Sequence, residues 1–127
     1  MRILFASPER DLLQCYSLLL GSELGEVVTA FDGAQVMALL ETEDFGLAVL
    51  DQGLPRLSWQ VLLRAANARR VPAIVLLDGS LRPGSADAAP EPAAFLRYPF
   101  RPEELIGLCR RVLAMDEEND GQVNGNE

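Results

Sequence analysis

Runs of hydrophobic residues without polar alternation mark the expected strands of this chain. Residues 47–50 (Leu-Ala-Val-Leu) and 73–77 (Ala-Ile-Val-Leu-Leu) contain no polar position. A strand with one solvent-exposed face alternates polar and apolar side chains. A strand buried on both faces is continuously apolar, as in parallel sheets. The pattern therefore predicts a sheet whose central strands are covered on both faces. Strands are expected over residues 2–6, 26–30, 47–50, 73–77 and 93–97.

Between these strands, hydrophobic residues recur at helical spacing. In the last such segment, Leu105, Leu108 and Val112 are spaced as i, i+3 and i+7, which is typical of an amphipathic helix. Ser7 before Pro8 is typical of a helix start, because serine caps helices and proline is tolerated at the first helical position. Helices are expected over residues 8–20, 33–41, 58–68 and 102–115.

The alternation of strands and helices predicts an α/β fold. Such an alternation produces a parallel sheet with right-handed crossovers. Five strands within residues 1–115 fit a flavodoxin-like, doubly wound five-stranded parallel sheet with strand order 2-1-3-4-5. Residues 78–92 contain three prolines and two glycines. The helix between the last two strands, the fourth in chain order, is therefore expected to be short or irregular.

Length and charge narrow the class of protein further. Residues 1–115 suffice for one domain with a buried core, and residues 116–127, which carry five acids and no base, are expected to form a disordered acidic tail. The formal net charge of −8 argues against nucleic-acid binding. No hydrophobic run approaches the roughly 20 residues that span a bilayer, and the first residues lack a signal-peptide pattern. A cytoplasmic protein without membrane contact is expected.

Asp51 is the first candidate for chemistry. It ends the apolar run 47–50 and precedes the turn-forming residues Gly53 and Pro55. Open α/β sheets place their sites at the carboxyl ends of strands, and strands one and three are neighbours in the order 2-1-3-4-5. Asp51 is therefore expected to face Ser7, which follows the first strand. On position alone, a residue that merely caps the end of a strand is an equally good interpretation of Asp51.

Several segments together resemble the receiver domain of two-component response regulators. The resemblance covers residues 1–115 and rests on Leu-Ala-Val-Leu-Asp-Gln-Gly-Leu-Pro around Asp51, Val-Pro-Ala-Ile-Val-Leu-Leu in the fourth strand, and Tyr-Pro-Phe-Arg-Pro-Glu-Glu-Leu before the last helix. A working receiver accepts a phosphoryl group from a phosphohistidine on the aspartate that ends its third strand. Asp51 matches this phospho-acceptor position. The resemblance also implies a cis peptide bond between Tyr98 and Pro99.

The metal ligands of the receiver reaction do not match. The resemblance implies an acidic pair after the first strand that holds Mg²⁺, and Ser7 and Pro8 occupy these positions, followed by Glu9. Mg²⁺ requires near-octahedral geometry and usually one or two carboxylates. Binding of Mg²⁺ is therefore expected to be weak or absent, and the sequence predicts no metal site and no cofactor.

The groups that would bind the phosphoryl group are also replaced. Leu77 stands where receivers have a serine or threonine, and Ser80 could supply that hydroxyl only if the following loop folded back. Tyr98 stands where receivers have a lysine, and the chain contains no lysine and no histidine. The resemblance thus implies a degenerate pocket around Asp51 made of Ser7, Pro8, Glu9, Leu77, Tyr98 and Pro99.

Three aromatic residues near this pocket each allow two interpretations. Tyr98 either fills the space of the missing lysine and ion, which we favour, or closes over a small ligand. Phe95 matches an aromatic switch residue of receivers, and it is either a packing residue or part of a partner-binding surface formed with the last helix. Trp59 stands where receivers usually have glycine. It is either an interface anchor or a residue buried under the adjacent loop, and we favour burial.

These features predict a pseudo-receiver, which is a signal-transduction module that binds a protein partner independently of phosphorylation. The partners considered are a sensor kinase, an output protein and a second copy of the chain as a homodimer. The alternative is a phosphorelay receiver whose Asp51 is still phosphorylated by a sensor histidine kinase. An enzyme on the same fold is disfavoured, because the chain has neither a glycine-rich phosphate loop nor a nucleophile–base pair.

Overall fold

Five parallel strands form one sheet in the order β2-β1-β3-β4-β5, which confirms the predicted flavodoxin-like fold. The structure is a computed structural model that describes residues 1–78 and 92–125. The strands are β1 (Arg2–Ala6), β2 (Glu26–Ala30), β3 (Leu47–Asp51), β4 (Ala73–Leu77) and β5 (Ala94–Arg97). The helices are α1 (Arg10–Glu23), α2 (Gly33–Thr42), α3 (Trp59–Ala68) and α4 (Pro102–Gly125).

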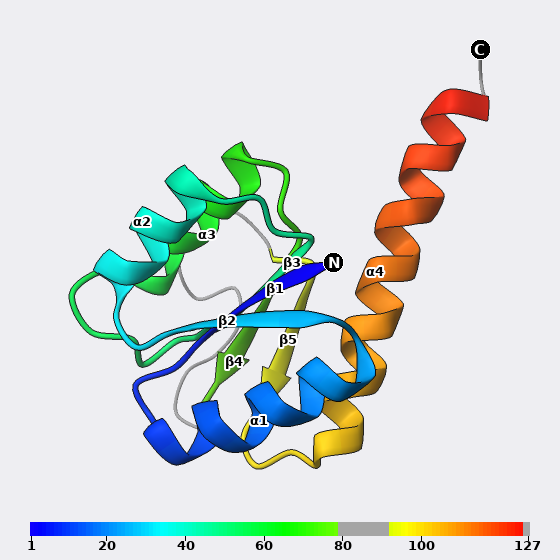
Figure 1. Cartoon of the computed structure of the whole chain (residues 1–127). Coiled ribbons are helices and arrows are strands. Elements are labelled where there is room, and N and C mark those ends of the chain that lie inside the picture. The colour runs from blue at the N-terminus through cyan, green and yellow to red at the C-terminus, as the bar shows by residue number, and fades with distance from the viewer. Residues whose placement is uncertain (79–91, 126–127) are drawn as a thin grey trace.

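Helices cover both faces of the sheet. In Figure 1, α2 and α3 lie on one face, and α1 and α4 lie on the other. Every residue of β3 and β4 is buried, because these apolar strands meet a helical layer on each side. The core accordingly consists of two clusters, one under α2 and α3 and one under α1 and α4.

The first helix begins later than predicted. Its N-cap is Glu9, whose backbone is extended, and helical residues start at Arg10. The prediction that Ser7 caps this helix, with Pro8 in the first helical position, is therefore wrong. Ser7 Oγ accepts the backbone N–H of Glu9 and donates to Asp51 on the neighbouring strand β3. It therefore closes a turn before the helix and binds the next strand, and it accepts from no N–H of α1 itself.

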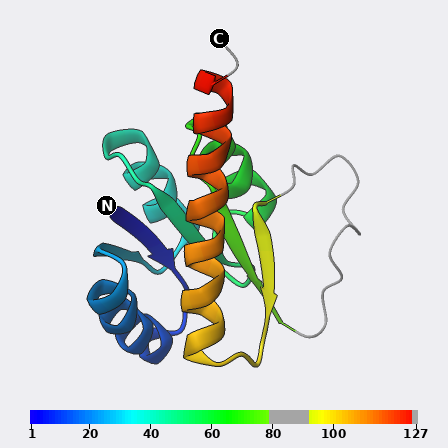
Figure 2. The same ribbon diagram turned by 90° about the vertical axis from the view of Figure 1, so that its right-hand side faces the viewer.

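The last helix ends later than predicted. The expected end lay near Met115, whereas α4 continues to Gly125 and its C-terminal part projects beyond the sheet in both Figure 1 and Figure 2. Residues 116–118 are Asp-Glu-Glu, and without glycine or proline nothing in them ends a helix. The division of the chain into a domain over residues 1–115 and an acidic tail over residues 116–127 stays a prediction.

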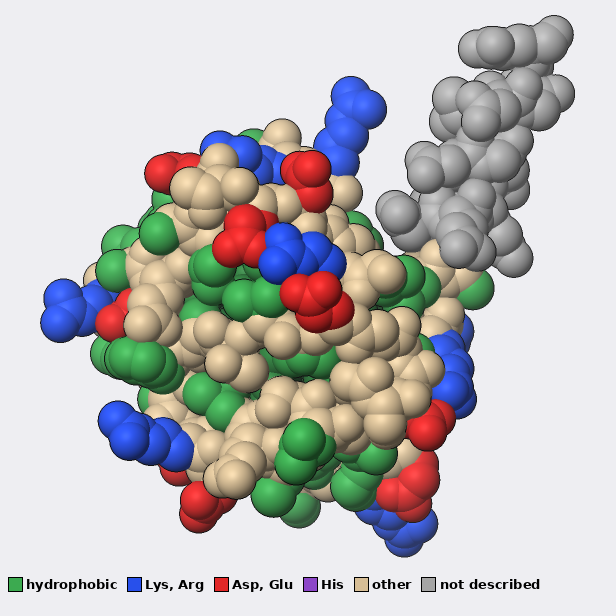
Figure 3. Space-filling model, viewed as in Figure 1, with side chains coloured by type: hydrophobic (Ala, Val, Ile, Leu, Met, Phe, Trp, Pro, Cys, Tyr) green, Lys and Arg blue, Asp and Glu red, His purple; other side chains and the backbone are tan. Residues whose placement is uncertain are grey.

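Some sequence predictions fall on residues 79–91, outside the part of the chain that the structure describes. These are the short or irregular fourth helix and the position of Ser80. Among the described helices, none combines the length and the apolar character needed to cross a membrane. On the face seen in Figure 3, hydrophobic side chains reach the surface in separate patches between charged side chains of both signs, which is ordinary for a folded domain.

Candidate functional site

The register of β1 and β3 places Ser7 beside Asp51. Ala6 pairs with Leu50, so the residues that follow these two lie together at the carboxyl end of the sheet. Ser7 is fully buried and Asp51 is 6% exposed, and the Ser7 Oγ donates a hydrogen bond of 2.9 Å to Asp51 Oδ2. The predicted meeting of these two residues is confirmed.

Three neutral donors from the described residues bind the Asp51 side chain. Oδ2 accepts hydrogen bonds from Ser7 Oγ and, at 3.0 Å, from the hydroxyl of Tyr98. Oδ1 accepts a hydrogen bond of 2.8 Å from the backbone N–H of Gly53. Both carboxylate oxygens therefore have donors supplied by the protein itself. Burial of a carboxylate is tolerated when its oxygens are hydrogen-bonded in this way.

Tyr98 reaches Asp51 from the far side of β4. Its backbone N–H donates a 2.8 Å hydrogen bond to the carbonyl of Leu77 at the end of β4, which fixes the start of the connection from β5 to α4. Burial, followed by the charge of Asp51, raises the pKa of the Tyr98 phenol well above its ordinary value. Tyr98 therefore keeps its proton at neutral pH and remains a donor to Asp51.

A row of aromatic rings continues from Tyr98 to α1. Tyr98 packs on Phe100 with ring centroids 4.9 Å apart, Phe100 on Tyr16 at 5.5 Å, and Tyr16 on Phe5 at 6.3 Å. This aromatic row supports the favoured interpretation of Tyr98, in which its ring fills space, and adds a hydrogen bond that the sequence did not indicate. The contribution of Phe100 and Tyr16 was also missed, although Phe100 stands only two positions after Tyr98.

The other predicted pocket residues are spread around this centre. Pro8 is exposed, and Glu9 is exposed while its backbone N–H donates a 3.1 Å hydrogen bond to Ser7 Oγ. Leu77 is fully buried in the core cluster under α2 and α3. Pro99 is exposed and follows the cis peptide bond that the resemblance implied, which is confirmed.

Trp59 and Phe95 form a separate aromatic pair. Trp59 is 8% exposed, and its ring meets that of Phe95 edge to face with centroids 6.0 Å apart. The predicted burial of Trp59 is confirmed, although part of its cover comes from β5 rather than from the adjacent loop. Phe95 is partly buried, so it serves packing and leaves some ring surface open.

The side chains hydrogen-bonded to Asp51 include no second carboxylate, and Glu9 is exposed. Asp51 provides a carboxylate, Ser7 a neutral hydroxyl, and Pro8 no side-chain ligand. Within the described residues there is no group of three or more His, Cys, Asp or Glu side chains that could hold a metal ion. Mg²⁺ is usually held by carboxylates in near-octahedral geometry, and this set offers a single buried one.

Comparisons with known proteins agree with the fold. No family model matches the chain. It is 28% identical over 116 residues to the response regulator GtcR of Aneurinibacillus migulanus; the match covers 87% of this chain and 47% of GtcR, so the chain spans about half the length of that relative. A CheY-like response regulator receiver domain protein from Methanospirillum hungatei has a TM-score of 0.81 at 26% identity, over 93% of this chain and 97% of that chain.

A further solved structure, NtrX from Brucella abortus in complex with ATP, has a TM-score of 0.85 at 23% identity, over 96% of this chain and 29% of that chain. At this identity the likeness concerns the fold alone. The fold and the aspartate at the end of β3 are similar to those of a response regulator receiver (CheY-like) domain, as the comparisons indicate. In this chain Ser7 and Tyr98 contact that aspartate, and Leu77 lies at the end of the neighbouring strand β4.

Replacing Tyr98 by phenylalanine should lower the free energy of unfolding by about 1–2 kcal/mol at pH 7, because Asp51 loses a donor while the aromatic row stays. The difference from the wild type should shrink above pH about 10, where tyrosine in the unfolded chain ionises. The pKa of Tyr98 is higher in the folded chain than in the unfolded chain. The stabilisation that Tyr98 provides is therefore complete below the pKa of the unfolded chain and is lost as the pH rises above it.

Urea unfolding at pH 7 and pH 10.5 measures both effects. Tyr16→Phe is the matched control, because Tyr16 belongs to the same aromatic row and no described hydrogen bond joins it to Asp51. Equal stability of Tyr98→Phe and the wild type at pH 7 would contradict a stabilising bond to Asp51.

Proposed function

We propose that this receiver domain is a pseudo-receiver, which binds a protein partner without phosphorylation of Asp51. The observation that carries the proposal is that Ser7 and Tyr98 both donate to Oδ2 of Asp51. A phosphoryl group on this oxygen would have to displace both donors. The remaining oxygen, Oδ1, already accepts the Gly53 N–H.

The charge balance of the pocket supports the same proposal. Phosphoryl transfer depends on cations that offset the charge of the transferred group. Leu77 at the end of β4 is apolar, Tyr98 beside Asp51 is held neutral, and the positions of the acidic pair hold Ser7 and Pro8. We therefore propose that Mg²⁺ binds weakly or not at all and that the domain needs no cofactor.

The proposed partner is a protein, and the proposed contact surface includes Phe95 on β5. This strand is only partly buried, with Arg97 exposed at its end. Phe95 is anchored on Trp59, so its remaining ring surface is presented in a fixed orientation. A fixed aromatic surface of this kind is typical of protein interfaces. A sensor kinase and an output protein are the partner classes that fit a receiver domain.

The test is a titration with Mg²⁺ followed by beryllofluoride, which mimics an aspartyl phosphate and needs the metal to bind. The Gly53 amide in NMR spectra reports directly on Oδ1 of Asp51, and Trp59 fluorescence reports on the neighbouring aromatic pair. We expect no saturable response with Mg²⁺ up to about 10 mM.

Asp51→Asn is the matched control for this titration. A saturable shift in the wild type that is lost in Asp51→Asn would overturn the proposal. It would instead support the alternative function, a phosphorelay receiver phosphorylated at Asp51 by a sensor histidine kinase.

A further inference from the structure

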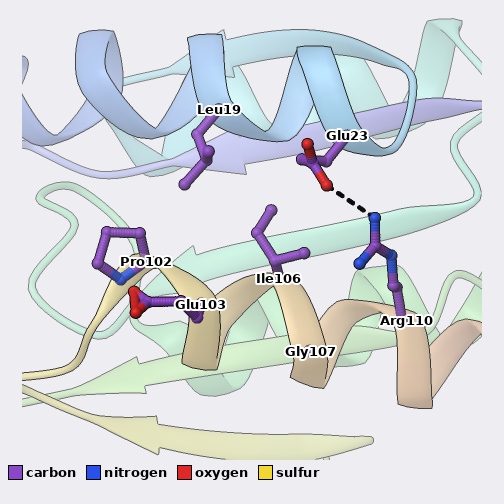
Figure 4. Close-up of a pocket in the computed structure, with 7 residues that line it drawn as sticks. All are labelled: Leu19, Glu23, Pro102, Glu103, Ile106, Gly107 and Arg110. Atoms are coloured by element: carbon purple, nitrogen blue, oxygen red, sulfur yellow. Dashed lines mark hydrogen bonds and ion pairs between the residues drawn. The ribbon is translucent and has the colours of Figure 1, made fainter.

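A groove runs between α1 and α4 on the face of the sheet that these helices cover. Its volume is about 430 Å³, and a neighbouring hollow of about 370 Å³ shares Leu19 and Pro102 with it and continues along α1. Figure 4 shows Leu19 and Glu23 on the α1 side, and Glu103, Ile106, Gly107 and Arg110 on the α4 side. Leu19 and Ile106 give the groove an apolar floor between charged ends.

Gly107 is the unexpected residue of this groove. It lies inside a helix, where glycine is about 1 kcal/mol less favourable than alanine. A Cβ atom built on Gly107 meets no described atom within 4 Å outside its own helical neighbours. No described contact within the chain therefore requires glycine here. The open space above it is available to a group from another molecule.

The residues along the α4 side of the groove have a symmetric spacing. Glu103, Ile106, Gly107 and Arg110 are separated by three, one and three positions. If a second α4 lies antiparallel across the first, Glu103 of each copy faces Arg110 of the other, and Ile106 faces Gly107. The α4 side of the groove is thus complementary in charge to a second copy of itself, as an interface with two-fold symmetry requires, while Glu23 on the α1 side adds a second carboxylate beside Arg110.

Arg110 is placed to take part in such a pair. It forms a 2.8 Å ion pair with Glu23, and the two side chains are 56% and 43% exposed, so Arg110 can meet a second carboxylate without leaving Glu23. Leu18, next to Leu19 on α1, is 71% exposed, more than any other exposed large hydrophobic residue of the described chain.

We propose that the α1–α4 groove binds a second copy of this chain, with the two α4 helices antiparallel and crossing at Ile106 and Gly107. The net charge of −8 opposes self-association in general. The opposite charges at the ends of the groove offset this repulsion locally. The dimer should therefore be weak and should dissociate as salt is added. The proposal rests on the α1–α4 face alone and does not depend on how Asp51 is used.

Sedimentation velocity of the full chain, from roughly 10 µM to 1 mM, tests the proposal. We expect a dimer that forms with rising concentration. Gly107→Gln fills the groove without changing the charge and should raise the dissociation constant by about tenfold or more. The same substitution improves helix propensity, and a Cβ atom at position 107 meets no described atom within 4 Å outside its own helical neighbours, so thermal unfolding of the monomer should not occur at a lower temperature.

A mixing experiment locates the charge pairs. Glu103→Arg and Arg110→Glu should each weaken self-association by on the order of tenfold, and an equal mixture of the two variants should dimerise again, because every facing pair is then opposite in charge. Arg111→Glu is the matched control; it changes the net charge by the same amount as Arg110→Glu but does not line the groove. A monomer at all concentrations, or a dimer insensitive to Gly107→Gln and to the charge changes, would overturn the proposal.

Discussion

Rebuilding the acidic pair with Ser7→Asp and Pro8→Asp should lower the free energy of unfolding by about 3 kcal/mol in EDTA. The new carboxylate of residue 7 would lie in a fully buried position next to Asp51, where Ser7 Oγ is now 2.9 Å from Oδ2. Two carboxylates at this distance repel each other and are poorly solvated. The donor hydroxyl that currently stabilises Asp51 is lost as well.

Millimolar Mg²⁺ should restore more than half of this loss, because a cation between two carboxylates removes the repulsion. Urea unfolding of the wild type and of the variant with Ser7→Asp and Pro8→Asp, each in EDTA and in Mg²⁺, measures the effect. The control Ser7→Asn with Pro8→Asn has similar volumes without the charge and should gain nothing from Mg²⁺. If the wild type were stabilised by Mg²⁺ as much as the acidic variant, the native pocket would already bind the metal, contrary to the proposed function.

Replacing Leu77 by threonine should lower the free energy of unfolding by about 2–4 kcal/mol. This is the position where receivers carry a serine or threonine, so the change restores the residue type that the family resemblance implies. In this chain Leu77 is fully buried and packs in the cluster under α2 and α3. Threonine leaves a cavity there and buries a hydroxyl among apolar side chains.

Chemical denaturation of Leu77→Thr and of Leu77→Met, compared with the wild type, separates the effect of side-chain size on stability from the effect of side-chain polarity. Leu77→Met conserves the side-chain volume and should lower the free energy of unfolding by less than about 1.5 kcal/mol. A Leu77→Thr chain as stable as the wild type would mean that a donor is available to the new hydroxyl. The end of β4 would then still be built as a polar pocket and not as core.

The sequence was most informative where burial alone decides the structure. The continuous apolar runs of β3 and β4 placed these strands and the parallel sheet, because only strands covered on both faces tolerate such runs. The start of α1 was predicted wrongly, because Ser7 Oγ accepts the N–H of Glu9 before the helix begins and donates to Asp51, 44 positions away along the chain. The contact with Asp51 cannot be inferred from the local Ser7-Pro8 pattern.

The site was predictable only in part for the same reason. Strand order places Ser7 beside Asp51, since adjacent parallel strands end at the same edge of the sheet. The hydrogen bond from Tyr98 was not predictable, because it depends on how far the phenol extends across the end of β4. The symmetric spacing around Gly107 is visible in the sequence, but its meaning depends on the open space that the packing of α1 against α4 leaves there.

The aromatic row that begins at Tyr98 lowers the apparent affinity of any ligand that binds at Asp51. A ligand can reach Oδ2 only in molecules where the Tyr98 hydroxyl has moved away, and this movement also disturbs the ring contacts to Phe100 and Tyr16. The apparent affinity of every such ligand is reduced by the fraction of molecules in which the site is open. A partner that also bound the displaced rings would recover part of this loss, so opening of the pocket and binding at the aromatic row are coupled.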